Sequence, residues 1–143
     1  MNFVSRFVVG SHLAVEPGDL DADGTVRREA IERWVHEQCE AYVARCTTLQ
    51  RDGASLRTRI TAFPDTPVTG SPARVIASAG ATELLPAAVV VAVRMRFAGG
   101  HDDQVVNLRC ELTLQGPDGS EEPLGPDVRD ELIALEHAAT FTN

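Results

Sequence analysis

The chain has 143 residues. Its 13 basic side chains, all arginine, are outnumbered by 21 aspartates and glutamates, which gives a net charge of −8. The absence of lysine excludes Schiff-base chemistry, a pyridoxal anchor and the lysine of a phosphate-binding loop. The acidic balance argues against a nucleic-acid partner, since the arginines form no basic run, while 43% hydrophobic residues are enough for a single folded domain spanning residues 1–143.

The N-terminal third predicts a strand, a tight loop and a long helix. β-branched and aromatic residues indicate a strand over Asn2–Val9 that ends at Gly10. Proline, glycine and three aspartates predict a loop over residues 17–26, PGDLDADGTV. Apolar residues then recur every three or four positions from Arg27 to Leu49, the spacing of an amphipathic helix that residues 51–53 would end.

The stretch from Ser55 to Gln115 has the period of two that is typical of strands. It divides into four predicted strands near residues 56–62, 73–80, 87–97 and 106–114, with connections short enough for antiparallel neighbours. Pro126 begins a last amphipathic helix with Val128, Leu132 and Leu135 on one stripe. A helix with one apolar face beside one antiparallel sheet predicts a two-layer α+β domain.

The order of these elements, with a strongly apolar central helix, resembles the hotdog fold, in which an antiparallel sheet wraps around one long helix. Residues 18–26, GDLDADGTV, are similar to the Asp-x-Asp-x-x-Gly loop of the 4-hydroxybenzoyl-CoA thioesterase branch of hotdog acyl-CoA thioesterases. Phe63-Pro64 to Gly70-Ser71-Pro72 resembles the family's connection between strands, and residues 126–132, PDVRDEL, resemble its C-terminal tail. The resemblance covers nearly the whole chain.

The resemblance implies that Asp21 is the catalytic aspartate, acting as nucleophile or as general base on water in thioester hydrolysis. It places the substrate beside the residues that follow in the loop and open the helix, which are Gly24, Thr25, Val26, Arg27 and Arg28. The amides of Arg27 and Arg28 are the expected oxyanion donors, and the Thr25 hydroxyl is the expected helix cap. Since two arginines oppose the helix dipole, we expect anionic neighbours for them.

The sequence departs from the family pattern after the glycine. The family commonly has His-Val-Asn-Asn there, whereas this chain has Thr25-Val26-Arg27-Arg28. This difference keeps a second hypothesis open beside the enzyme, namely a non-catalytic hotdog domain that binds an acyl thioester or a partner subunit. Asp19 and Asp23 are interpreted as turn or capping residues.

Other polar clusters have simpler interpretations. A calcium loop begun at Asp19 would need an acidic residue where Ala30 stands, and His101-Asp102-Asp103 follows two glycines as a hairpin tip would, so no metal and no cofactor are expected. His36 and Glu37 lie on the polar side of the helix and are interpreted as solvated or interface-facing. The stripe with Trp34 and Tyr42 is interpreted as core.

The expected setting is cytoplasmic. The longest apolar run, Pro86–Val93, is far shorter than the ~20 residues of a membrane span, and the N-terminus has no signal-peptide pattern. Cys39 and Cys46 lie roughly 10 Å apart on the predicted helix, beyond disulfide distance, so buried thiols are expected. The resemblance implies a homodimer or homotetramer acting on acyl-CoA or an acyl-carrier protein, with the phosphates of the nucleotide meeting some of Arg57, Arg59, Arg94 and Arg96.

Overall fold

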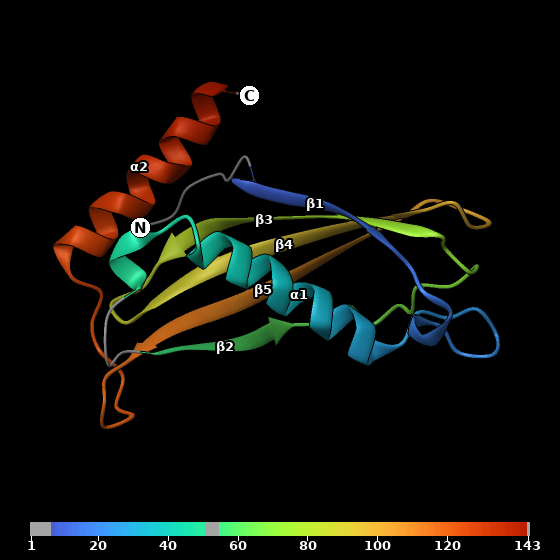
Figure 1. Ribbon diagram of the computed structural model, residues 1–143, viewed down its shortest axis with the longest axis horizontal. Coiled ribbons are helices and arrows are strands. Elements are labelled where there is room, and N and C mark those ends of the chain that lie inside the picture. Colours follow the sequence, from blue (N-terminus) through green and yellow to red (C-terminus); the bar gives the residue numbers. More distant parts are fainter. Residues whose placement is uncertain (1–6, 51–54, 143) are drawn as a thin grey trace.

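The computed structural model describes residues 7–50 and 55–142 and contains one sheet and two helices (Figure 1). Two short 3-10 turns accompany them, at Pro17–Asp19 and Thr47–Leu49. The elements are β1 (Val9–Ala14), α1 (Arg28–Val43), β2 (Ser55–Ala62), β3 (Arg74–Leu84), β4 (Ala88–Ala98), β5 (Gln104–Gln115) and α2 (Pro126–Thr142). The chain therefore has the α+β element order that the sequence predicts.

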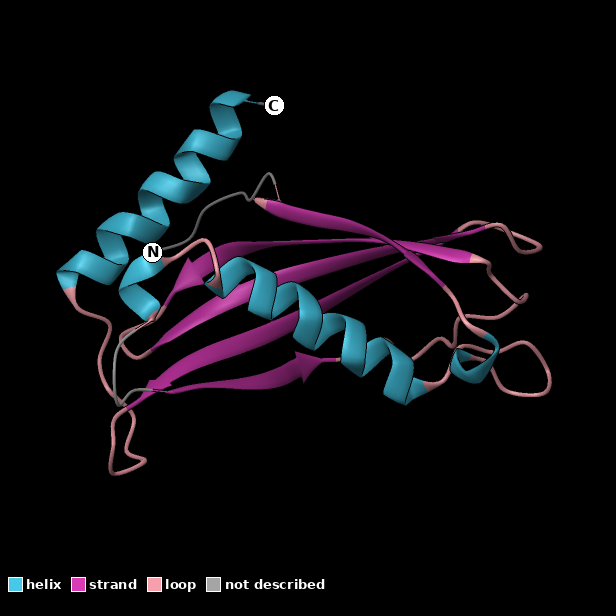
Figure 2. Ribbon diagram, viewed as in Figure 1, coloured by secondary structure: helices cyan, strands magenta, loops and turns pink. Residues whose placement is uncertain are grey.

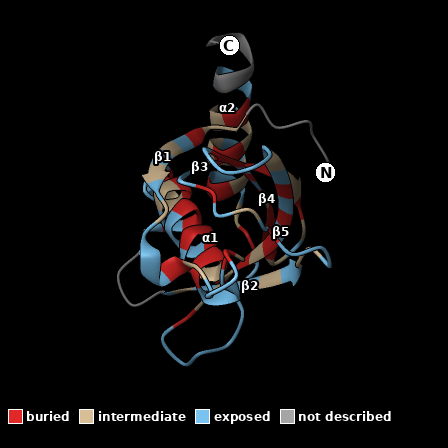
Figure 3. Cartoon of the chain, turned by 90° about the vertical axis from the view of Figure 1, so that its right-hand side faces the viewer, coloured by how far each residue is buried: buried red, intermediate tan, exposed pale blue. Residues whose placement is uncertain are grey.

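The five strands form one antiparallel sheet in the order β1-β3-β4-β5-β2. Helix α1 lies along one face of the sheet, and α2 packs at one end, against β3 and the Thr47–Leu49 turn (Figure 2). The contacts of α1 are mainly with β1, β3 and β4, so the helix sits toward one side of the face. Figure 3 shows the strands curving around α1, with buried residues between the two layers.

Small side chains on β3 let α1 lie close to the sheet. Val75, Ala77 and Ala79 are fully buried on the inner face, and Trp34 and Tyr42 of α1 are almost completely enclosed. The Trp34 and Phe97 rings meet with centroids 5.9 Å apart, a tilted packing that adds to the gain from burying apolar area. The interpretation of the aromatic stripe as core is confirmed.

Two predicted boundaries are wrong at the ends of β1 and α1. The predicted strand over residues 2–9 lies mostly outside the described residues, and β1 instead runs from Val9 to Ala14, where the backbone pairs with β3. Pairing therefore makes a strand of a polar stretch that its own residues did not favour. Helix α1 ends at Val43 instead of Leu49, and residues 51–53, expected to end it, lie outside the described residues.

The strand β2 has a different neighbour from the one expected. Its predicted residues are confirmed, but it pairs with β5 and not with the next strand along the chain. The connection from Phe63 to Ala73 thus crosses the end of the sheet, which brings it to the loop before α1. Strand β3 continues to Leu84, so residues expected in a connection are paired with β4.

The expectation of buried cysteine thiols is confirmed. Cys39, Cys46 and Cys110 are buried free thiols. In the described part of the chain, neither helix combines the length and apolar character that crossing a bilayer requires.

Candidate functional site

The aspartate loop between β1 and α1 is a compact hairpin held by its own backbone. Leu20 and Val26 form an antiparallel bridge, the Asp21 N–H donates to the Thr25 carbonyl over 2.8 Å, and the Gly24 N–H donates to the Asp21 carbonyl over 3.0 Å. Gly24 has a φ of +85°, which favours glycine because other residues are strained there. The sharp turn at Gly24 thus fixes the position of Asp21.

The crossing connection from β2 to β3 anchors this loop. The Val26 N–H donates to the Val68 carbonyl over 2.8 Å, and the Ser71 N–H donates to the Gly24 carbonyl over 3.0 Å. A Cβ at Gly24 would overlap the Ser71 hydroxyl, so the two segments approach as closely as glycine permits. The two sequence stretches that carry the family resemblance are therefore in direct contact.

Asp19 is a structural carboxylate, as its interpretation as a turn or capping residue predicts. Only 7% of its side chain is exposed, and its two oxygens accept hydrogen bonds from Arg33 over 2.8 Å and from the Glu16 amide over 2.9 Å. Burial alone would raise the pKa of Asp19, but these hydrogen bonds and the charge of Arg33 hold it below its ordinary value. Asp19 therefore ties the loop to α1.

Asp21 is exposed at the surface of the loop, in contrast to Asp19. Its side chain is 55% exposed, and its carboxylate lies 3.5 Å from Nε of Arg27. The neighbouring Asp23 accepts a hydrogen bond from the Thr25 amide over 3.1 Å, which confirms its role in the turn. Asp21 and Asp23 are thus both exposed, and Asp21 is the one that contacts the start of α1 through Arg27.

The arginines at the start of α1 have anionic neighbours, as the sequence predicts, although Glu32, the neighbour of Arg28, was not among the acids expected there. Arg27 meets Asp21, and Arg28 pairs with Glu32 over 3.0 Å while its guanidinium lies 4.0 Å from the centre of the Phe63 ring. These contacts offset the cost of placing cations near the positive end of the helix dipole.

The open amides at this helix end differ from those expected. The Arg27 N–H is occupied, because it donates to the Asp19 carbonyl over 2.8 Å. The antiparallel bridge between Leu20 and Val26 holds these two groups together. In the described part of the chain, the amides of Arg28 and Glu29 meet no acceptor. The expected Thr25 cap is also wrong, since Arg27 is the N-cap residue and no described side chain caps it. The open amides are therefore those of Arg28 and Glu29. The sequence carries no signal for this shift by one residue, because it follows from the way the loop backbone folds onto the Arg27 amide.

A small cavity of about 180 Å³ lies beside the start of α1. Val26 and Ile31 form its apolar floor, and the connection with Phe63 and Val68 forms its wall. Of the residues that the sequence assigned to the substrate, Val26 and Arg28 line this cavity, Gly24 is buried in the loop, and Arg27 is exposed beside Asp21.

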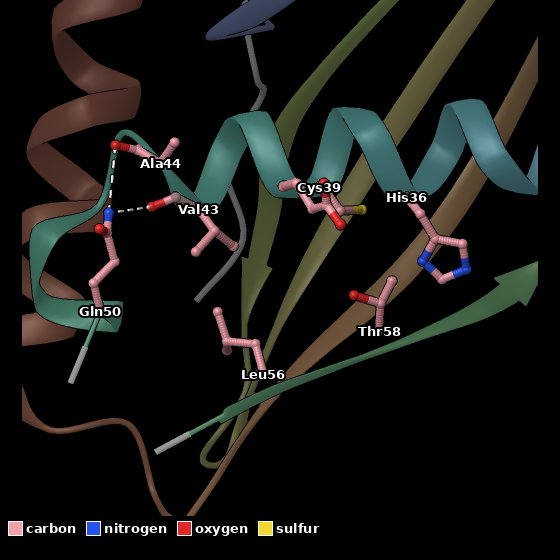
Figure 4. A pocket seen from close by; sticks show the side chains of 8 residues that line it. His36, Cys39, Val43, Ala44, Gln50, Leu56 and Thr58 are labelled. Atoms are coloured by element: carbon pink, nitrogen blue, oxygen red, sulfur yellow. Dashed lines mark hydrogen bonds between the residues drawn. The ribbon is translucent and has the colours of Figure 1, made fainter. Parts of the chain in front are cut away.

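A larger cavity of about 580 Å³ opens between the C-terminal half of α1 and strand β2 (Figure 4). Its lining mixes apolar and polar side chains: His36, Cys39, Glu40, Val43, Ala44, Gln50, Leu56 and Thr58. Contact with Cys110 and burial raise the pKa of Cys39, so its thiol is protonated and inert at neutral pH. His36 is exposed, as expected for the polar side of the helix, and it lines this cavity.

Solved structures of several thioesterases superimpose on most of the chain. One from Thermus thermophilus, bound to coenzyme A and zinc, is 20% identical with a TM-score of 0.68 over 92% of this chain and 96% of that one. An aspartate-to-asparagine variant of 4-hydroxybenzoyl-CoA thioesterase with its substrate is 17% identical, with a TM-score of 0.66 over 87% and 97%. The chain has the hotdog fold. DHNA-CoA thioesterase from Staphylococcus aureus, at 10% identity, gives a TM-score of 0.66 over 94% of both chains.

This hotdog chain is similar to these proteins in structure and only distantly in sequence. Its sequence matches no protein-family model and no curated protein. Among the described residues, no three His, Cys, Asp or Glu side chains gather as they would around a metal ion. The expected resemblance to the hotdog fold is confirmed by structure.

Proposed function

We propose that the protein is a cytoplasmic hydrolase of acyl-CoA or acyl-carrier-protein thioesters and that Asp21 is its catalytic carboxylate. The observation that carries the proposal is the exposed Asp21 carboxylate, which lies 3.5 Å from Nε of Arg27, the N-cap residue of the helix whose first amides, those of Arg28 and Glu29, are open among the described residues. The hotdog neighbours named as thioesterases for coenzyme A substrates support it.

The proposed reaction needs one base and one anion site. Asp21 takes a proton from water, the resulting hydroxide attacks the thioester carbonyl carbon, and the amides of Arg28 and Glu29 donate to the carbonyl oxygen as it becomes negative. The C–S bond then breaks, and the protonated Asp21 returns its proton to the leaving thiolate. A direct attack by the Asp21 carboxylate, with an anhydride that water then cleaves, uses the same two elements.

A second copy of the chain would complete this site. Strand β2 is an edge of the sheet, and within the described residues its other edge has no strand partner. Antiparallel pairing of two β2 strands about a two-fold axis reverses one chain against the other. This pairing would bring the larger cavity at the C-terminal half of one α1 toward the aspartate loop of the other chain. We therefore propose a homodimer, alone or doubled to a tetramer, with the acyl group bound between protomers.

Thiol release from a panel of acyl-CoAs and acyl-carrier proteins tests the activity. Asp21→Asn keeps the shape and removes the charge, so turnover should fall by about 10²–10⁴ while binding persists. Asp23→Asn is the matched control, because it removes a charge from the same exposed turn, and it should keep the wild-type rate. Asp19→Asn is unsuitable as a control because Asp19 holds the loop in place.

Two results would contradict the proposal. A wild-type protein that binds acyl thioesters and releases no thiol would support the non-catalytic acyl-binding domain instead. An Asp21→Asn variant with full turnover would transfer the catalytic role elsewhere. Light scattering that gives a monomer mass at micromolar concentration would separately rule out the shared site.

A further inference from the structure

The outer face of the sheet, which turns away from α1, carries six of the chain's thirteen arginines. Alternate residues of a strand point to opposite faces, so the residues between the buried positions of each strand project outward. The outward arginines are Arg57, Arg59, Arg74, Arg94, Arg96 and Arg109, and all are exposed. In the sequence they are scattered over more than fifty positions, which is why composition showed no basic surface.

Strand pairing arranges these six arginines as a diagonal line, which we call the arginine stripe. Arg74 pairs with Ala98 at one end of β4, and Arg96 and Arg94 follow along that strand. Arg109 of β5 pairs with Ala92, two residues beyond Arg94. Arg59 and Arg57 of β2 then pair with Glu111 and Thr113, so each step advances two residues along the strands.

The dimensions of the arginine stripe follow from sheet geometry. It advances about ten residue positions along the strands at ~3.3 Å each. It also crosses three strand spacings of ~4.8 Å, so the stripe is about 36 Å long and about one side chain wide on each strand.

Most of the charge on the arginine stripe has no counterpart on the molecule. Arg59 pairs with Glu111 over 2.7 Å. The other five guanidinium groups have no carboxylate within 4.0 Å among the residues that the structure describes. Apart from Glu111, the acids at this face are Glu83, opposite the outward Val90, and Glu121, which lines a pocket with Arg57 and Arg59 at the β2 end of the stripe. A protein with a net charge of −8 therefore concentrates positive charge on one face.

We propose that the arginine stripe is a docking surface for an acidic helix of a partner protein, an inference that is independent of the catalytic role of Asp21. A helix of about 24 residues would span the stripe, and its diameter of about 10–12 Å matches a narrow line of charge. Guanidinium groups suit carboxylates because their paired donors match the two oxygens. Complementary charge of this kind steers association and fixes its orientation.

Other occupants fit the stripe less well. A second copy of this chain would place six arginines against six. A nucleotide is too short to engage more than a part of a 36 Å line, by the same approximate geometry. A lipid surface or a nucleic acid spreads negative charge over a wide footprint and would meet the acidic remainder of the protein. No Phe, Tyr or Trp projects outward from the described strands, and His12 of the edge strand β1 is the one outward aromatic ring there, so bases have no row of rings to stack on along the stripe.

Fluorescence anisotropy with a labelled, helical alanine–glutamate peptide of about 24 residues tests the proposal. The wild-type protein should bind the peptide, and added salt should weaken binding because screened charges attract less. The double variant Arg94→Glu/Arg109→Glu should lose at least about tenfold in affinity. Arg129 is unsuitable for a control variant because its side chain donates to the Leu124 and Leu85 carbonyls. The matched comparison therefore uses two single variants, Arg94→Glu on the stripe and Arg45→Glu away from it.

The single variants make the same change in net charge. Arg45 is exposed at the end of α1, off the sheet face, so Arg45→Glu should change the affinity by less than about twofold, and Arg94→Glu should change it by about threefold or more. Circular dichroism checks that both variants are folded. Equal losses in the two single variants would overturn the proposal, because they would reflect net charge alone.

The same assay separates the other occupants. Peptide binding that coenzyme A displaces at micromolar concentration would overturn the proposal in favour of a nucleotide site. Tighter binding to phosphatidylserine vesicles or to a single-stranded oligonucleotide than to the peptide would also overturn it, as would the absence of any peptide binding at low salt.

Discussion

At its N-terminal end, α1 leaves the amides of Arg28 and Glu29 open among the described residues, and its N-cap residue Arg27 contacts the exposed Asp21, whereas at its C-terminal end the Gln50 side chain binds the last carbonyls. The Gln50 amide donates to the carbonyls of Val43, Ala44 and Cys46 over 3.1 to 3.4 Å. The backbone amides at one end of this helix are therefore open to a ligand, whereas the backbone carbonyls at its other end already have hydrogen-bond donors.

The C-terminal end is also the better anchored of the two. Glu131 of α2 accepts hydrogen bonds from the Thr47 hydroxyl, the Thr48 hydroxyl and the Thr48 amide over 2.8 to 3.0 Å. Burial alone would raise the pKa of Glu131, but these three donors hold it below its ordinary value. Burial raises the pKa of Cys46 to about 12, so that thiol is neutral.

We therefore expect the C-terminal end of α1 to contribute mainly to stability and its N-terminal end to the proposed reaction. Unsatisfied backbone donors are costly when buried, so open amides at a helix end lie at the surface, where water or a ligand can meet them. Substitutions at the C-terminal end should therefore change the free energy of unfolding and leave turnover intact. Substitutions in the aspartate loop should affect the geometry of the site.

The largest effect on stability is expected from Glu131→Ala. The variant removes three hydrogen bonds to one carboxylate and should lower the free energy of unfolding by about 3 kcal/mol. Urea unfolding measures this loss, and Asp130→Ala, an exposed acid in the same helix, is the matched control with little expected change. A Glu131→Ala protein as stable as the control would show that the two ends of α1 do not differ in this way.

Gly24→Ala should have an intermediate effect at the other end. The new Cβ meets the Ser71 hydroxyl and the backbone has a positive φ, so we expect a loss of about 2 kcal/mol in the free energy of unfolding. Gly18→Ala, with nothing within 4 Å of its new Cβ, should change stability little. Equal behaviour of the two variants would mean that the loop is not held against the crossing connection as described.

The smallest effect, about 1 kcal/mol at neutral pH, is expected from Asp19→Asn, and it should depend on pH. The folded pKa of Asp19 lies below its unfolded value, so its stabilising contribution is present above the unfolded pKa of about 3.9 and is lost as the pH falls through the folded pKa. Wild-type protein should therefore lose more stability than Asp19→Asn between pH 5 and a pH of about 2.5, as urea unfolding at several pH values would measure. Parallel pH profiles would contradict the ion pair with Arg33.

Local sequence was sufficient for the elements whose pattern is strong. The apolar spacing around Trp34 and Tyr42 predicted α1, and the alternation in residues 56–62 and 106–114 predicted β2 and β5. The loop motif with Asp21 and Gly24 also pointed to the region of the proposed site. These features depend on residues near one another in the chain, where periodicity and turn chemistry act directly.

What the sequence by itself determined is the α+β element order, the apolar face of α1 and the identity of the loop that carries Asp21. Only the tertiary structure decided that β2 pairs with β5, that Asp19 is buried on Arg33 while Asp21 stays exposed, and that the open amides are those of Arg28 and Glu29. It also aligned six distant arginines into one stripe. The physical reason is that strand pairing and the burial of a charge depend on partners far away in the chain, whose positions no local pattern specifies.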